Sequence, residues 1–103
     1  MNFLKQLFSG RQTIDLKNII EQGAFLVDVR TPDEFAGGHV RGSVNIPLNT
    51  IQTQLPKFKN KKNIIVFCLS GGRSSQAKSI LEQNGFTNVV NGGTWKHVNQ
   101  YVN

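Results

Sequence analysis

The sequence predicts an α/β fold in which a central, mainly parallel five-stranded sheet is flanked by helices on both faces. Two short runs rich in β-branched and aromatic residues, 25–29 and 64–67, are typical of buried strands. A segment with helical spacing follows each run, and strands that alternate with helices favour parallel pairing. The length of 103 residues is enough for one hydrophobic core and too short for two.

The beginning of the chain is expected to hold an extension, a short strand and a helix. Residues 1–12 are predicted to be an N-terminal extension, and residues 13–103 are predicted to form the domain itself. The first strand is expected at residues 13–14. Asp15 is then expected to cap a helix that ends at Gly23, because a carboxylate accepts from free helical N–H groups and a glycine tolerates the turn that follows.

The next segment is expected to run from a buried strand to a short edge strand. After the strand 25–29, Pro32 and the two acidic residues behind it have the pattern of a first helical turn, and Gly37 is expected to end this short helix. A loop then leads to a short strand at 44–46. Pro47 closes that strand, because proline cannot donate to the ladder.

The second half repeats the alternation. Residues 48–55 have modest helical spacing, and the buried strand 64–67 is followed by a longer helix over 74–84. A last strand is expected at 86–90. The glycine pair 92–93 is expected to open a terminal helix.

The chemistry is expected at the end of the strand 64–67, where the chain has its one cysteine, Cys68. The loop 69–72 contains two glycines that can adopt positive φ, so successive backbone N–H groups can turn inward. The helix that follows adds free N–H groups and the positive end of its dipole. Arg73 adds a full charge. The pattern indicates an anion-binding loop around a thiol of lowered pKa.

The spacing Cys-x4-Arg narrows the range of anions that the loop is expected to bind. A loop one residue longer, Cys-x5-Arg, is the signature of cysteine phosphatases and arsenate reductases, which bind a tetrahedral oxyanion. The shorter loop favours one extra sulfur atom on Cys68, a persulfide, over a phosphoryl group. An arsenate reductase also needs a second cysteine to form an internal disulfide, and the chain has one cysteine. A phosphatase or arsenate reductase is therefore the weaker alternative.

Three stretches carry a family likeness. They are Leu26-Val27-Asp28-Val29-Arg30 with the downstream Gly38-His39 and Asn45-Ile46-Pro47, then Cys68-Leu69-Ser70-Gly71-Gly72-Arg73-Ser74, then Val90-Asn91-Gly92-Gly93. In this order and spacing the chain resembles a single-domain rhodanese, a sulfurtransferase homology domain. The resemblance covers about residues 13 to 100 and implies a rhodanese-like fold.

The resemblance also implies a reaction and the roles of residues. Cys68 would be the nucleophile that takes sulfane sulfur from a small anionic donor such as thiosulfate and passes it, through a persulfide, to cyanide or a thiol. The implied substrate-binding residues are Arg73, Leu69, Ser70, Gly71, Gly72 and Ser74. Asp28 and Arg30 would form a supporting ion-pair network beneath the loop, and Glu34 and His39 are expected to belong to the scaffold.

One departure from the family pattern supports a second function. Leu69 stands where many members place arginine or another polar residue, so we expect weaker thiosulfate binding than in members with a basic loop. The alternative to an enzyme that turns over thiosulfate is a persulfide carrier, which would receive sulfur from a protein donor and deliver it to a protein acceptor.

Composition sets the remaining expectations. The net charge of +6 favours anionic small molecules as ligands. The basic run 57–62 lacks the aromatic residues of a nucleic-acid surface, so no nucleic acid partner is expected.

No membrane span is expected, and the first ten residues lack the continuous apolar region of a secretory signal. One cysteine and two histidines are too few for a metal site, and no cofactor is expected. A free thiol suits the cytoplasm, and a monomer is expected.

Overall fold

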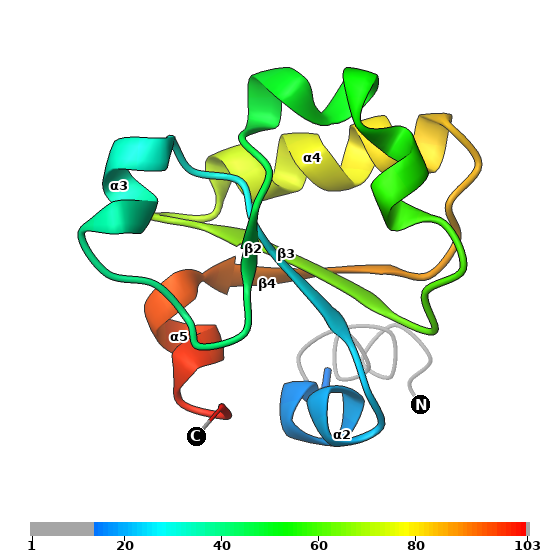
Figure 1. Ribbon diagram of the computed structural model, residues 1–103. Coiled ribbons are helices and arrows are strands. Elements are labelled where there is room, and N and C mark those ends of the chain that lie inside the picture. Colours follow the sequence, from blue (N-terminus) through cyan, green and yellow to red (C-terminus); the bar gives the residue numbers. More distant parts are fainter. Residues whose placement is uncertain (1–13, 103) are drawn as a thin grey trace, which may run out of the picture.

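The computed structural model describes residues 14–102, and Figure 1 shows a layered arrangement of helices around one sheet. The predicted extension, residues 1–12, lies outside the described residues. In chain order the elements are α2 (Leu16–Glu21), β1 (Phe25–Asp28), α3 (Pro32–Ala36), β2 (Val44–Asn45), the 3₁₀ helices η1 (Leu48–Thr53) and η2 (Leu55–Phe58), β3 (Ile64–Cys68), α4 (Gly72–Gln83), β4 (Val89–Thr94) and α5 (Trp95–Asn99).

The described sheet has four strands in the order β2-β1-β3-β4, and all neighbours are parallel. The α/β class and the parallel sheet are confirmed, but the prediction of five strands is wrong. The strand expected at residues 13–14 is missing in the described part: Thr13 lies outside it, and Ile14 is in no strand and is 50% exposed. Ile14 directly precedes Asp15, the cap of α2, so the chain is already entering the helix at this point.

The two faces of the sheet bury separate apolar clusters, because successive side chains of a strand point to opposite faces. On one face Val27, Val66 and Cys68 pack against residues of α4 and of the two 3₁₀ helices. On the other face Leu26 and Ile65 pack with residues of α2 and α5. In Figure 1 α4 lies on one side of the sheet, and α2 and α5 lie on the other. Helices on both faces were predicted.

The short helices begin where capping residues occur in the sequence. The carboxylate of Asp15 accepts from the N–H of Asn18 at 3.1 Å. Thr31 and Glu34 form a capping box around Pro32, in which the Thr31 side chain accepts from the Glu34 N–H and the Glu34 carboxylate accepts from the Thr31 N–H. These two caps satisfy free N–H groups of α2 and α3. Glu34 lies in the first turn of α3, shortly after the carboxyl end of β1.

Strand β4 differs from its prediction. It begins at Val89 and includes the glycine pair, which was expected to open the last helix. Val66 pairs with Asn91 while Phe67 pairs with Gly93, so Gly92 is the extra residue of a β-bulge. A Cβ on Gly92 would lie 2.7 Å from Val98 Cγ2 and 2.9 Å from Ile65 Cγ2. The glycine therefore serves close packing inside the sheet, where α5 crosses β4 and β3.

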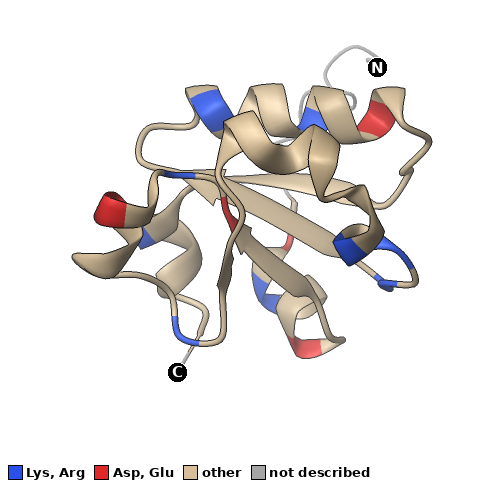
Figure 2. Cartoon of the chain, turned by 45° about the horizontal axis from the view of Figure 1, so that its top comes forward, with Lys and Arg blue, Asp and Glu red and all other residues tan. Residues whose placement is uncertain are grey.

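Most charged residues lie in loops and on helices at the surface (Figure 2). Asp28 and Arg30 are the buried charged residues among those described. None of the described helices has both the length and the apolar character needed to span a bilayer.

Candidate active site

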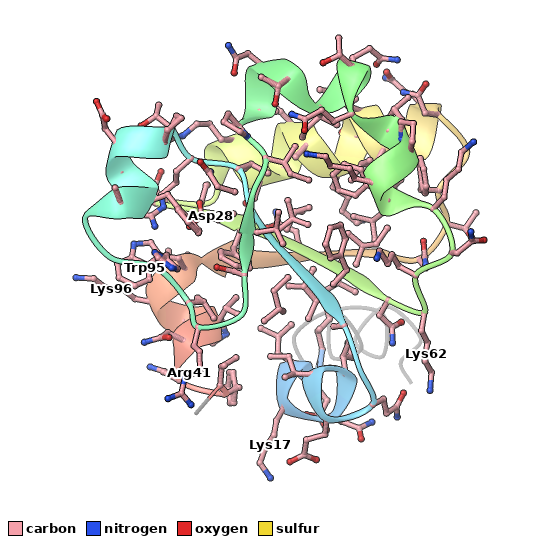
Figure 3. All side chains as sticks on the ribbon, in the orientation of Figure 1. Lys17, Asp28, Arg41, Lys62, Trp95 and Lys96 are labelled. Carbon is pink, nitrogen blue, oxygen red and sulfur yellow. The ribbon has the colours of Figure 1, made fainter. Side chains whose placement is uncertain are left out.

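The carboxyl end of β1 holds a buried ion pair. The guanidinium of Arg30 lies on the carboxylate of Asp28, with Nη2 2.7 Å from Oδ2 and Nε 3.0 Å from each carboxylate oxygen. The backbone N–H of Arg30 also donates to Asp28 Oδ1, at 3.0 Å. Figure 3 labels Asp28 at this edge of the sheet and Trp95 at the start of α5. The predicted pairing of these two residues is what the structure contains.

The same arginine fastens neighbouring segments to β1. Its Nη2 donates to the carbonyl of Gly38 at 2.7 Å, and its guanidinium lies 4.7 Å from the centre of the Trp95 ring. The amide of Asn45 in β2 donates to the backbone carbonyls of both Asp28 and Arg30 at 3.0 Å. The pair thus joins the end of β1 to β2, α5 and the loop after α3.

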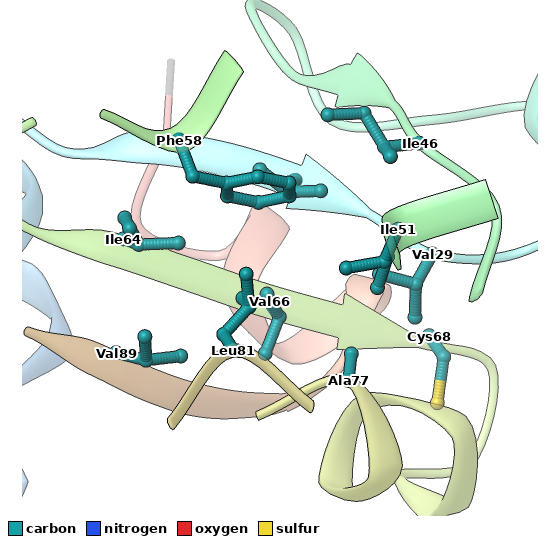
Figure 4. Packing of buried hydrophobic residues seen from close by; sticks show 11 residues of the cluster. Val29, Ile46, Ile51, Phe58, Ile64, Val66, Cys68, Ala77, Leu81 and Val89 are labelled. Atoms are coloured by element: carbon teal, nitrogen blue, oxygen red, sulfur yellow. The ribbon is translucent and has the colours of Figure 1, made fainter. Parts of the chain in front are cut away.

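Cys68 is the last residue of β3, and its side chain has no exposed surface. Gly71 adopts φ +103 just before α4, which turns the loop back over the sulfur. The Gly71 N–H donates to Sγ at 3.0 Å, and the Ser74 N–H donates to it at 3.3 Å. Figure 4 shows the sulfur beside the first turns of α4. The loop and the start of the helix therefore surround the thiol with donors, as predicted.

These donors govern the ionisation of the thiol. Burial of the sulfur acts to raise the pKa of Cys68. Hydrogen bonds with the hydroxyl and N–H of Ser74, and with the N–H groups of Gly71 and Ser70, act in the opposite direction and prevail. The pKa of the thiol is consequently below its ordinary value, which favours the nucleophilic thiolate.

Ser74 connects the sulfur to the neighbouring strand. Its Oγ lies 3.5 Å from Cys68 Sγ, 3.1 Å from the carbonyl oxygen of Gly71 and 2.8 Å from Oδ1 of Asn91. Asn91 belongs to β4, and its Oδ1 also accepts from the N–H of Gly93 at 2.9 Å. A buried hydroxyl on α4 thus lies between the thiol and a side-chain amide that the β-bulge holds in place.

Arg73 lies at the mouth of the site and is bound to Glu34 of α3. Its Nη1 is 2.6 Å from Oε1, and its Nη2 is 3.0 Å from Oε2, a bidentate arrangement. The hydrogen bond from Arg73, helped by that from the backbone of Thr31, lowers the pKa of Glu34 from 4.5 to about 2. Arg73 therefore links the active loop to α3 through a carboxylate.

A cavity of about 250 Å³ opens beside this arginine. Its lining includes Val29, Leu48 and Arg73, so apolar side chains and one charge share it. Leu69, the first residue of the loop, is 52% exposed. The surface beside Arg73 is therefore partly apolar, and the loop after Cys68 exposes one apolar side chain.

The structure brings the predicted loop residues together around Cys68 and adds two residues to them. Leu69, Ser70 and Gly71 form the turn, Gly72 and Arg73 begin α4, and Ser74 contacts the sulfur. Glu34, expected to belong to the scaffold, binds Arg73 directly, and Asn91, which precedes the glycine pair in the third family motif, contacts Ser74. A polar residue directly before a glycine pair was the signal available for Asn91. Between residues 14 and 102, no three His, Cys, Asp or Glu side chains are grouped in a way that could hold a metal ion.

Comparisons with known proteins give a consistent result. The family model of the rhodanese-like domain matches residues 13–94. The chain is similar to the thiosulfate sulfurtransferase PspE of Escherichia coli (strain K12), with 38% identity over 74 residues that cover 70% of this chain and 71% of that protein. It is 35% identical over 94 residues to a tRNA uridine(34) hydroxylase of Buchnera aphidicola, covering 82% of this chain and 30% of that protein. A solved structure described as rhodanese with anions from E. coli superposes with a TM-score of 0.66 and 36% identity, covering 73% of this chain and 91% of that one.

Proposed function

The chain belongs to the rhodanese-like domain family, and on this premise we propose that it is a sulfurtransferase that carries sulfane sulfur on Cys68 as a persulfide. One observation carries the proposal: the sulfur of Cys68 lies among backbone N–H donors at the start of α4, which lower the pKa of the thiol. Donors arranged in this way stabilise a negative charge on sulfur.

In the first step, the Cys68 thiolate attacks the outer sulfur of thiosulfate. A bond forms between Sγ and that sulfur, the S–S bond of thiosulfate breaks, and sulfite leaves with the electron pair. The product is a Cys68 persulfide whose negative charge is on the outer sulfur. The N–H groups that now bind Sγ are suited to hold this anion.

In the second step, an acceptor attacks the outer sulfur of the persulfide. Cyanide leaves as thiocyanate, and a thiolate leaves as its own persulfide; in both cases the electron pair of the broken S–S bond returns to Cys68 as thiolate. Two successive half-reactions on one cysteine predict ping-pong kinetics.

Arg73 contributes the positive charge that attracts the anionic donor to the site.

The sulfur is covered in the described conformation, so a donor must displace part of the loop to reach it. Cys68 has no exposed surface, whereas the next two residues of the loop, Leu69 and Ser70, are exposed. A shift of this short turn uncovers Sγ and leaves β3 in place. We expect donor access to depend on the turn 69–71.

A second candidate function is a persulfide carrier between proteins, and the exposure of Leu69 favours it. An apolar side chain beside the sulfur binds thiosulfate poorly and suits contact with a protein surface. The relative named tRNA uridine(34) hydroxylase is a longer protein of which this chain matches 30%, so the fold also occurs as a part of larger proteins. We place either reaction in the cytoplasm, because a free thiol persists in reducing surroundings. We also propose that the protein acts as a monomer.

The test is the mass of the intact protein after incubation with thiosulfate. We expect a gain of about 32 Da, one sulfur atom, which a reducing thiol then removes. Cys68→Ser should show no gain. Failure to gain mass with thiosulfate and with polysulfide would contradict both sulfur functions. If the mass is gained but thiosulfate turnover is slow while transfer from a protein persulfide donor is fast, the carrier is the correct function.

A further inference from the structure

We propose that Asn91 is a positioning residue that directs the hydroxyl hydrogen of Ser74. It thereby controls whether that hydroxyl donates a hydrogen bond to the sulfur of Cys68. The proposal rests on the proposed function in one respect, the use of Cys68 as the reacting thiol. Asn91 comes from β4, a different element from the loop and helix that hold the sulfur.

The orientation of the Asn91 amide follows from its neighbours. The backbone N–H of Gly93 lies 2.9 Å from one terminal atom of the Asn91 side chain, and an N–H requires an oxygen there. The same atom is 2.8 Å from the Ser74 hydroxyl. Oδ1 therefore faces Ser74, and the bulge that offsets Gly93 from Asn91 holds it in this direction.

The hydroxyl of Ser74 has more acceptors than hydrogens. The Ser74 hydroxyl has one hydrogen, and its nearest neighbours are two acceptors that have none to give: Asn91 Oδ1 at 2.8 Å and the Gly71 carbonyl at 3.1 Å. The shorter contact takes the hydrogen. A lone pair of Oγ is then left toward Cys68, whose S–H can donate across the 3.5 Å contact. In this arrangement Ser74 stabilises the protonated thiol.

Ionisation of the thiol reverses the requirement. A thiolate has no hydrogen and accepts hydrogen bonds, so the Ser74 hydroxyl must turn from Asn91 to Sγ in order to stabilise it. Asn91 competes with the sulfur for one hydrogen. It holds that hydrogen while Cys68 is protonated and releases it when negative charge develops on the sulfur.

The charged groups near the sulfur come from other elements. Arg73 of α4 interacts electrostatically with Cys68, and its charge is neutralised in part by Glu34 of α3. Arg73 also interacts electrostatically with Asp28 at the end of β1, whose carboxylate is paired with Arg30. Strand β4 has no titratable side chain. A substitution of Asn91 by an uncharged residue therefore leaves these charges unchanged.

The decisive experiment is a double-mutant cycle with Asn91→Ala and Ser74→Ala. Thiolate formation is followed by ultraviolet absorbance against pH, and by the rate of alkylation with iodoacetamide at a pH below the titration midpoint. Asn91→Ala removes the closer acceptor of the Ser74 hydrogen and leaves only the Gly71 carbonyl, at 3.1 Å, to compete with the sulfur. The alkylation rate should therefore rise about three- to tenfold, the effect of one hydrogen bond. In the Ser74→Ala background the same substitution should change the rate by less than about twofold.

A second variant covers the case in which Asn91→Ala does not fold because the Gly93 N–H loses its acceptor. Asn91→Asp keeps an oxygen for both Gly93 and Ser74, and it adds negative charge near the sulfur. The alkylation rate at the same pH should then fall by about threefold or more. Unchanged titration in Asn91→Asp, or an equal effect of Asn91→Ala with and without Ser74, would overturn the proposal. No sulfur donor is used, so the outcome is independent of the mass test of the proposed function.

Discussion

The site contains two arginine–carboxylate pairs that differ in where they lie. Arg30 and Asp28 are two residues apart on one strand end, and their side chains are 4% and 0% exposed. Arg73 and Glu34 come from α4 and α3, and their side chains are 34% and 30% exposed. Both arginines bind their carboxylate through two nitrogens. The same chemical pair is thus used once inside the fold and once at its surface.

The buried pair Asp28–Arg30, the inner pair, supports the fold, and the more exposed pair Glu34–Arg73, the outer pair, supports the reaction. A buried charge that loses its partner is left without water, and the cost is several kcal/mol. A pair with about a third of its side-chain surface exposed is screened by solvent, so its partners separate at little cost. The inner pair therefore holds the end of β1 in place, whereas the outer pair can open when an anion competes for Arg73.

The largest expected effect comes from breaking the inner pair. Asp28→Ala leaves the guanidinium of Arg30 buried without a counter-charge and should lower the free energy of unfolding by about 3–5 kcal/mol. Urea denaturation followed by circular dichroism measures this loss. Lys17→Ala is the matched control, because it breaks an exposed pair with Glu21 and should cost less than about 0.5 kcal/mol. Similar losses in the two variants would contradict the conclusion that burial makes the Asp28–Arg30 pair more important for the fold than an exposed pair.

A smaller effect on stability and a clear effect on activity are expected at the outer pair. Arg73→Met keeps the apolar stem but removes the charge at the mouth of the site. Its kcat/KM for thiosulfate should fall about tenfold or more, while its urea midpoint moves much less than that of Asp28→Ala. Lys78→Met is the control on the same helix, since it breaks the exposed pair with Glu82. If Arg73→Met destabilises the fold as much as Asp28→Ala, Arg73 is a scaffold residue too.

The smallest expected effect is a pH dependence of the outer pair. The folded-state pKa of Glu34 is about 2, below its ordinary 4.5, mainly because of the hydrogen bond from Arg73. The pair therefore stabilises the folded protein fully above pH 4.5, and this stabilisation is lost as pH falls toward 2. Glu34→Gln should be less stable than the parent above pH 4.5 and about equally stable near pH 2. Urea titrations at both ends of this range measure the difference; a constant gap would contradict the assignment.

Sequence reasoning succeeded where the information is local. The buried strands β1 and β3, the cap at Asp15 and the turn at Gly71 each depend on residues within a few positions of one another. The placement of Cys68 at the end of a parallel strand follows from the same local pattern. The pairing of Asp28 with Arg30 was also within reach, because the two residues are neighbours.

The failures involve contacts between distant segments. Arg73 and Glu34 are 39 residues apart, so no local pattern reveals that the arginine of the loop already has a carboxylate partner. The glycine pair was expected to open a helix. This was wrong because a glycine in the sequence does not show which side chains pack against it in the fold. The structure places Val98 and Ile65 against Gly92, and this packing keeps the pair in the strand.

That glycine limits how far the scaffold can be redesigned. Even alanine at position 92 would set a methyl group 2.7 Å from Val98 Cγ2, so α5 or the strand would have to move. The bulge at Gly92 also sets the direction of Asn91, whose oxygen reaches the Ser74 hydroxyl. An engineer who retunes the thiol through β4 must therefore treat residues 91 to 93 as a single unit, in which the shape of the backbone and the reactivity of the cysteine change together.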